Sequence, residues 1–326
     1  MERYRIIKPL GSGGNCNAFL GKDTESGRLV TIKRCKTEGD TQDEIVRKNL
    51  VNEARILEEL EHEAVPSLYE RSAGEIVLEY IPGNSLEKVL LTNGTFNEKE
   101  AIRIAYELAS VMRYLHGRRE PVIYRDLKPS NIVLKPDGHI CLIDYGAARF
   151  YEAGCVNDTL NLGTLGFAAP EQFGNLGQTD PRTDIYCFGM TLLQMVSGVD
   201  TRDAEAVVTY KRNGIKGISS GFLGIVEKCT HADREDRFRS FKEIQEELEL
   251  LPRKNKLRKI TNGIRITVLA ACLSLIISVG IIKADEVKNY AVSDVTARMP
   301  AVKQRFGYAR WWIEDYFTNK EVIDLE

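Results

Sequence analysis

Hydrophobic and polar residues alternate along the first quarter of the chain, which is the pattern of half-buried β-strands. The predicted strands cover residues 4–10, 18–22, 29–34, 67–71 and 75–80. Between the third and fourth strands, apolar residues recur at helical spacing and predict a helix over residues 43–60. The pattern therefore predicts a small β-rich lobe that covers about residues 1–81.

After the Pro-Gly pair at residues 82 and 83, the hydrophobic period becomes helical. The predicted helices cover residues 98–116, 183–197, 221–229 and 241–250. They indicate a larger helical lobe over about residues 82–250. The predicted fold class is α+β, with two lobes in one domain that spans residues 1–250.

Residues 266–282 read ITVLAACLSLIISVGII and contain no charge. At about 1.5 Å per residue, this run lies within the usual range for a helix that crosses a hydrocarbon core of about 30 Å. We expect a transmembrane helix over residues 264–282, a basic linker at 251–263 and a short tail at 283–326. The basic linker places the domain in the cytoplasm and the C-terminus outside, as a single-pass protein of the cell membrane. A buried core helix is the alternative, but it rarely has such a basic flank.

Composition excludes several classes of protein. The 326 residues contain 45 Lys and Arg against 47 Asp and Glu, so the chain lacks the basic excess of a nucleic-acid-binding protein. The seven cysteines are scattered and form no C-x-x-C pair, which argues against both a zinc site and a disulfide framework.

Two features of the first lobe suggest phosphate binding. Residues 10–16 read LGSGGNC between the first two strands, and glycines let a backbone approach phosphates closely. The third strand carries VTIK at residues 30–33, which places Lys33 near its end. Taken alone, the two features fit a plain glycine-rich hairpin and a solvated lysine equally well.

Three further motifs favour phosphate binding over a plain hairpin and a solvated lysine. They are YRDLKPSN at residues 124–131, IDYG at 143–146 and GTLGFAAPE at 163–171. With all five motifs in this order and spacing, the sequence resembles the protein kinase family over about residues 4–250. It looks like a bacterial, membrane-anchored serine/threonine kinase. The resemblance implies the bilobal protein kinase fold, with a β-rich N-lobe and a helical C-lobe.

The resemblance also implies roles for individual residues, because phosphoryl transfer needs alignment and neutralisation of charge. Lys33 should hold the α- and β-phosphates, paired with Glu53 or, as a weaker candidate, Glu44. Asp126 should accept or orient the proton of the substrate hydroxyl, with Lys128 beside the transferred group.

Cofactor and structural roles follow from the same motifs. Asp144 and Asn131 should hold Mg²⁺, or Mn²⁺, because their oxygens suit hard cations. Thr164 should brace the catalytic aspartate and lysine from the substrate side. The resemblance further implies an ion pair between Glu171 and Arg237, and an Asp184 that holds the backbone of the catalytic loop.

ATP should bind between the lobes under the glycine-rich loop. The residues expected around its phosphates are Leu10, Gly11, Ser12, Gly13, Gly14, Asn15 and Cys16, and those around the adenine are Leu10, Ala18, Thr31, Leu78, Val133 and the backbone of Glu79 and Ile81. The apolar members of this set also fit ordinary core positions.

Three residues depart from the family pattern. Cys16 replaces the third glycine of the loop, Tyr124 replaces the usual histidine, and Tyr145 replaces the usual phenylalanine. Both tyrosines keep an aromatic ring, and none of the phosphate-handling groups is lost. Activity is therefore the expectation, and an ATP-binding pseudokinase scaffold is the alternative.

The segment between Asp144 and Glu171 should be the activation loop. Arg125 and Arg149 together suit a phosphothreonine, and Thr159 is the candidate phosphorylation site. The alternative, that both arginines simply pair with nearby acids, stays open. The expected activity is ATP-dependent phosphorylation of serine and threonine in protein substrates, including trans-autophosphorylation within a homodimer of membrane-tethered copies.

Overall fold

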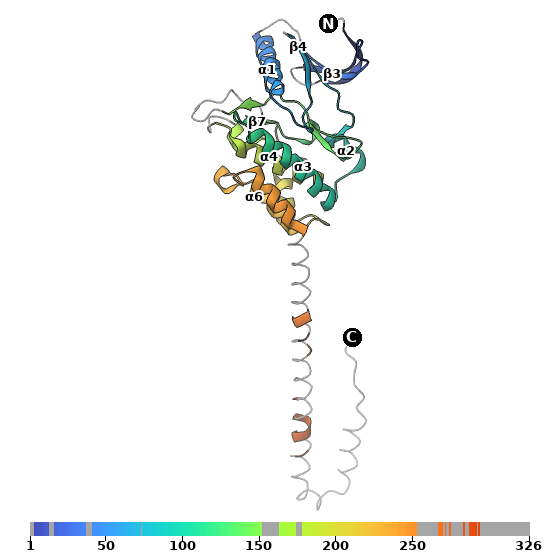
Figure 1. Cartoon of the computed structure of the whole chain (residues 1–326). Coiled ribbons are helices and arrows are strands. Elements are labelled where there is room, and N and C mark those ends of the chain that lie inside the picture. Colours follow the sequence, from blue (N-terminus) through green and yellow to red (C-terminus); the bar gives the residue numbers. More distant parts are fainter. Residues whose placement is uncertain are drawn as a thin grey trace, which may run out of the picture. The chain divides into compact units, whose positions relative to one another are not determined.

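The computed structural model describes residues 3–12, 16–36, 41–72, 74–151, 163–173 and 178–252, and a few residues between 267 and 293. The chain divides into two units, Met1–Asn255 and Lys256–Glu326. The first unit has the two lobes that the resemblance implied, a blue sheet with α1 and a group of green to orange helices (Figure 1).

The first lobe is an antiparallel sheet with the strand order β1-β2-β3-β5-β4. Its strands are β1 (Tyr4–Ser12), β2 (Cys16–Asp23), β3 (Leu29–Cys35), β4 (Leu68–Ser72) and β5 (Glu75–Glu79). Val30, Ile32 and Val77 form a small apolar cluster on one face. Ile76 and Leu78 alternate to the other face, where they join the main core. The five predicted strands are thus confirmed, with ends that differ by one to a few residues.

Helix α1 (Thr41–Glu58) positions one side of the site. Its buried residues, which include Ala54 and Leu57, belong to the same core cluster as Ile76. Lys33 pairs with Ile76 in the β3–β5 register, so its side chain leaves the sheet on the face that packs against α1. The predicted helix over residues 43–60 is confirmed, although it begins and ends two residues earlier.

The second lobe is built around α3 (Glu98–His116) and α4 (Pro181–Ser197). Asn97 caps α3 together with Glu100, and Asp180 caps α4 ahead of a proline. Helix α6 (Ser220–Cys229) approaches α4 closely at Gly189. Any larger residue there would clash, since a Cβ at Gly189 would lie 2.6 Å from the Cβ of Cys229. Residues 241–252 are also helical, so the four predicted helices of this lobe are confirmed.

Two helices were not predicted from the sequence. They are α2 (Leu86–Asn93), capped by Ser85, and α5 (Ala204–Asn213), capped by Asp203. Both are short and bury only one residue each, so neither has a hydrophobic stripe that a periodicity search detects.

Short strands and turns carry the motifs to the cleft. The strands are β6 (Asn84–Ser85), β7 (Val122–Ile123), β8 (Ile132–Leu134), β9 (Ile140–Leu142) and β10 (Arg149–Phe150), and the 3-10 turns are η1 (Pro129–Asn131), η2 (Pro170–Gln172) and η3 (Arg234–Asp236). β7 ends directly before Tyr124, β8 begins directly after Asn131, and β9 ends two residues before Asp144. Backbone pairing therefore anchors both ends of the motif at residues 124–131 and the start of the motif at 143–146.

No helix in the part of the chain that the structure describes is both long and apolar enough to cross a membrane. The predicted basic linker and transmembrane helix lie mostly outside the described residues, as does the tail. Membrane anchoring therefore stays a prediction.

Candidate active site

Lys33 forms ion pairs with a carboxylate on α1 and with a carboxylate that follows β9. Its ammonium nitrogen lies 2.6 Å from Glu53 Oε1 on α1 and 2.7 Å from Asp144 Oδ1, which follows β9. Burial lowers the pKa of Lys33, but the two carboxylates outweigh burial, so the net shift is upward and the ammonium stays charged. Lys33 in turn holds the pKa of Asp144 below its usual range. The weaker candidate Glu44 pairs with Lys48 instead.

Asp144 is held in a strained backbone conformation. Its φ of 68° lies in the left-handed region, which costs a residue with a Cβ about 1–2 kcal/mol. The next amide, that of Tyr145, donates to Glu53 Oε1 at 3.1 Å and so helps to hold this turn. One buried carboxylate therefore positions both the Lys33 ammonium and the Asp144 turn.

Four polar side chains meet at the catalytic loop, which is formed by residues 124–131; three belong to the loop, and Thr164 comes from the later motif at 163–171. Asp126 Oδ1 accepts from the Thr164 hydroxyl at 2.6 Å, and Lys128 Nζ lies 2.8 Å from Asp126 Oδ2. Lys128 also donates to the Thr164 hydroxyl at 2.6 Å. Asn131 Nδ2 donates to Asp126 Oδ2 at 3.0 Å. Asp126 is thus held by three neighbours, and Thr164 makes the contacts that the resemblance implied.

The Asp184 carboxylate, on α4, holds the backbone at the start of this loop. The amides of Tyr124 and Arg125 donate to its two carboxylate oxygens at 2.8 and 2.6 Å. Arg125 has a φ of 69°, so the loop is strained immediately before Asp126. His116 Nε2, at the end of α3, also lies 2.8 Å from Asp184 Oδ2. His116 was not predicted from the sequence, because nothing in the local pattern distinguishes it from a solvated residue at a helix end.

The donor set fits Mg²⁺. Asp144 is half exposed, with 47% of its side chain accessible, so its carboxylate can meet a cation in the cleft. The Asn131 amide nitrogen donates to Asp126, so its oxygen is the end that accepts, and in the structure it receives the Ser130 hydroxyl at 3.4 Å. A carboxylate and an amide oxygen are ligands that Mg²⁺ prefers.

The expected nucleotide site is described in part. Gly13, Gly14 and Asn15 lie outside the described residues, whereas Gly11 and Ser12 end β1. Leu10 is exposed and Val133 is buried. Ala18 is half-buried, and its register partner on β3 is Lys33. Leu10 and Ala18 thus belong to β1 and β2 of the first lobe, and Val133 belongs to β8 of the second.

The end of β5 makes the expected adenine contact of Glu79 more specific. The Glu79 amide already donates to Ser67 O at 2.8 Å, so the Glu79 carbonyl is the backbone group expected to contact adenine. Leu78 and Thr31 pair across β3 and β5, and Ile81 is half-buried. The backbone of Ile81 stays the second expected contact.

The Cys16 thiol is a poor nucleophile. Burial raises its pKa to about 12, and the thiol of Cys35, its cross-strand partner, contributes to the shift. The glycine-loop cysteine is therefore a neutral, half-buried side chain at neutral pH.

The two unusual tyrosines pack against each other in the core. Their rings meet edge to face at 5.2 Å, and the Tyr124 hydroxyl donates to Ile143 O. The Tyr145 hydroxyl is fully buried and has no hydrogen-bond partner among the described residues. Relative to phenylalanine, such an unsatisfied group costs about 1–3 kcal/mol.

The expected regulatory residues are only partly described. Thr159 lies outside the described residues. Arg125 is buried, and Arg149 Nη2 donates to Thr179 O at 2.9 Å, which ties the start of the activation segment to the approach to α4. The phosphothreonine pocket stays a prediction.

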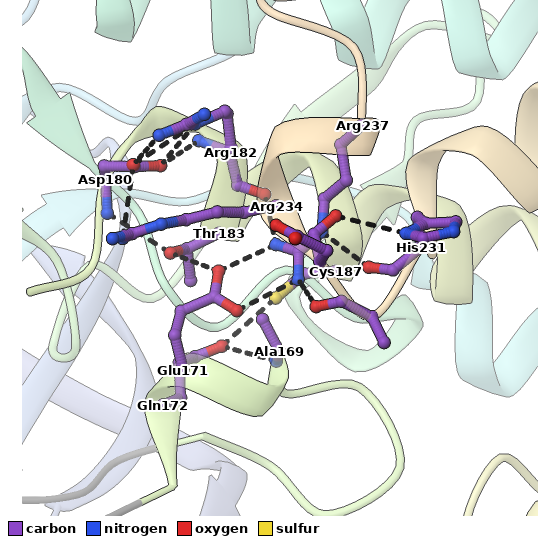
Figure 2. Close-up of polar contacts among 12 residues, drawn as sticks. Ala169, Glu171, Gln172, Asp180, Arg182, Thr183, Cys187, His231, Arg234 and Arg237 are labelled. Atoms are coloured by element: carbon purple, nitrogen blue, oxygen red, sulfur yellow. Dashed lines mark hydrogen bonds and ion pairs between the residues drawn. The ribbon is translucent and has the colours of Figure 1, made fainter. Parts of the chain in front are cut away.

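A buried ion pair anchors the end of that segment, as Figure 2 shows. Arg237 Nη1 and Nη2 donate to Glu171 Oε1 and Oε2 at 2.7 and 3.0 Å, and Thr183 Oγ1 donates to Oε1 at 3.0 Å. The Arg237 guanidinium also lies over the ring of Tyr186. This is the pair that the resemblance implied.

A cavity of about 550 Å³ lies beside Lys128 and Thr164. Its walls include the apolar residues Leu165, Phe167 and Val199. Lys128 and Thr164, which both contact Asp126, face this cavity.

Comparisons with known proteins agree with this geometry. Residues 4–250 match the family described as "Protein kinase domain". The chain is similar to Serine/threonine-protein kinase D of Synechocystis sp., with 36% identity over 211 residues, which covers 59% of this chain and 40% of the relative. It is also similar to Serine/threonine-protein kinase PrkC of Bacillus subtilis, with 29% identity over 212 residues, 64% of this chain and 32% of the relative.

Serine/threonine-protein kinase PknA of Nostoc sp. is 29% identical over 271 residues, which covers 76% of this chain and 47% of the relative. The chain therefore spans less than half the length of each of these three relatives. Because the family match covers residues 4–250 of 326, the chain belongs to the protein kinase family.

Proposed function

We propose that this protein transfers the γ-phosphoryl group of ATP to serine and threonine hydroxyls of proteins. The observation that carries the proposal is the simultaneous assembly of two groups of residues. Lys33 contacts both Glu53 and Asp144, and Asp126 contacts both Lys128 and Thr164. An ATP-binding scaffold would need neither group to be complete.

In the proposed reaction, the substrate oxygen attacks the γ-phosphorus and the bond to the ADP oxygen breaks. Asp126 orients the attacking hydroxyl and takes up its proton on a carboxylate oxygen. Lys128, 2.8 Å from Asp126, neutralises charge on the transferred group, and Lys33 holds the α- and β-phosphates. Mg²⁺, held by Asp144 and Asn131, would neutralise charge on the phosphates.

Preference for serine and threonine is supported by Lys128 and by the relatives. The Asp-Leu-Lys-Pro wording at residues 126–129 resembles that of serine/threonine kinases. Three similar proteins bear the name serine/threonine-protein kinase.

The test is labelling of the full chain and a general protein substrate with γ-labelled ATP, followed by analysis of the phosphorylated amino acids. We expect phosphoserine and phosphothreonine, no phosphotyrosine, and no label when EDTA removes Mg²⁺. ATP binding without any label on protein would favour the pseudokinase scaffold instead.

We also propose that the chain is tethered to the cell membrane through residues 264–282 as a single-pass protein, with its kinase domain in the cytoplasm. The uncharged run at 266–282 and its basic flank support this. The expected result is that the full chain stays with membranes during alkaline carbonate extraction, and that Ile276→Lys with Ile277→Lys releases it. Release of the unaltered chain would contradict the tether.

Tethered copies could phosphorylate each other's activation segments, with Thr159 as the proposed site.

A further inference from the structure

Gln172 lies at the end of η2, one residue after the buried ion pair, and its side chain is turned inward. The residue is only 7% exposed. Figure 2 marks the contacts of its amide oxygen with the Ala169 amide and with the Cys187 thiol, which donates at 3.5 Å. The Ala169 amide donates to Gln172 Oε1 at 2.9 Å, and Gln172 Nε2 donates to Arg125 O at 2.9 Å. Only one orientation of the amide group satisfies both partners, so the donor and acceptor ends are unambiguous.

The contact with Arg125 O acts on the peptide that leads into Asp126. Arg125 is in the left-handed region, with a φ of 69°. Asp184 holds the Arg125 amide on one side of this residue, and Gln172 holds its carbonyl on the other. The Arg125–Asp126 peptide plane sets the direction in which the Asp126 side chain leaves the backbone. Gln172 therefore fixes the half of the strained turn that Asp184 does not reach.

The contact with Ala169 acts on the segment that carries Thr164. The amides of Phe167 and Ala168 both donate to Thr164 O at 3.0 Å, which makes a tight turn. The Ala169 amide, which follows that turn directly, is held by Gln172. Thr164 in turn donates to Asp126 at 2.6 Å. One amide group thus connects both segments whose meeting places Thr164 against Asp126.

We propose that Gln172 is a positioning residue for phosphoryl transfer, which acts by fixing Asp126 relative to Thr164. This inference rests on the proposed kinase function. The role needs a donor toward Arg125 O and an acceptor toward Ala169 N at the same time. A carboxylate supplies only the acceptor, and a methionine supplies neither.

The test compares Gln172→Glu and Gln172→Met in the full chain. The matched control is Gln245→Met, because Gln245 is a 6% exposed glutamine of the same lobe that accepts from Arg113 at 3.3 Å, away from the catalytic loop. Rates are normalised to the fraction of chain that binds MgATP. We expect kcat to fall by about 10- to 100-fold in both Gln172 variants near pH 8.5, as misplaced reacting groups do. KM for MgATP should stay within about twofold, as it does in the control.

The pH profile of Gln172→Glu separates positioning from simple loss of stability. At high pH, the introduced carboxylate faces Arg125 O without a proton to donate. Burial raises the pKa of such a carboxyl group, so between about pH 8.5 and about pH 6 it gains the proton that the contact needs. The kcat of Gln172→Glu relative to wild type should therefore rise as the pH falls, while the relative kcat of Gln172→Met stays flat.

Three results would overturn the inference. They are a kcat within about twofold of wild type in both variants, a kcat loss matched by an equal rise in KM, or a flat pH ratio for Gln172→Glu. A wild-type chain without transferase activity would instead overturn the proposed function, and this inference with it. The wild-type measurement in the same series therefore tells the two failures apart.

Discussion

Asp126→Asn lowers kcat by about 10²- to 10⁴-fold in the proposed mechanism, with little change in affinity for MgATP. Asparagine keeps the shape of the side chain and can still accept from Thr164, but it cannot take the proton of the attacking hydroxyl. It also removes the charge that faces Lys128 at 2.8 Å. Steady-state kcat and the MgATP-dependent rise in Tm measure the two effects separately.

Asp137→Asn is the matched control for Asp126→Asn. Asp137 is an exposed aspartate of the same lobe whose carboxylate accepts from the His139 amide. The substitution makes the same change in charge and shape, so it should leave kcat within about twofold of wild type. A kcat for Asp126→Asn within about tenfold of wild type would contradict the role assigned to Asp126.

Arg237→Ala should lower the free energy of unfolding of the kinase domain by about 3–5 kcal/mol. It leaves the Glu171 carboxylate buried, with Thr183 as its remaining partner among the contacts described above. The carbonyls of His231, Ala232 and Arg182 also lose a donor. The midpoint of denaturant unfolding measures the loss, at an unchanged dependence on denaturant concentration.

A second variant separates the buried charge from lost packing. In Arg237→Leu with Glu171→Leu, no uncompensated carboxylate remains, so the double variant should be more stable than Arg237→Leu alone. The opposite order would show that the stranded charge is not the main cost. A loss below about 1 kcal/mol in Arg237→Ala would contradict the account of this ion pair.

Much of the site could be predicted because its residues occur in contiguous motifs. The segments around Lys33, Asp126 and Asp144 each carry recognisable neighbours, and the structure brings them together. Glu53 could be chosen over Glu44 because it lies within the apolar stripe of its helix, whereas Glu44 precedes it. The structure places Glu53 at 2% exposure and Glu44 on the surface.

His116 and Gln172 could not be predicted, because their roles depend on partners far away in the sequence. His116 meets Asp184, 68 residues later, and Gln172 meets Arg125, 47 residues earlier. The start of α4 was misplaced for a different reason. This helix is buried on most sides and so has little hydrophobic period, and its start is set by the Asp180 cap and the proline that follows.

The central claim is phosphoryl transfer by the Asp126 site, and phosphosite mass spectrometry of the full chain with MgATP tests it most directly. Wild-type and Asp126→Asn chains would be dephosphorylated, incubated side by side and compared. The account predicts phosphate on serine and threonine of the wild type only, with Thr159 occupied first. Phosphate at equal levels in both chains, or in neither while both bind ATP, would contradict it.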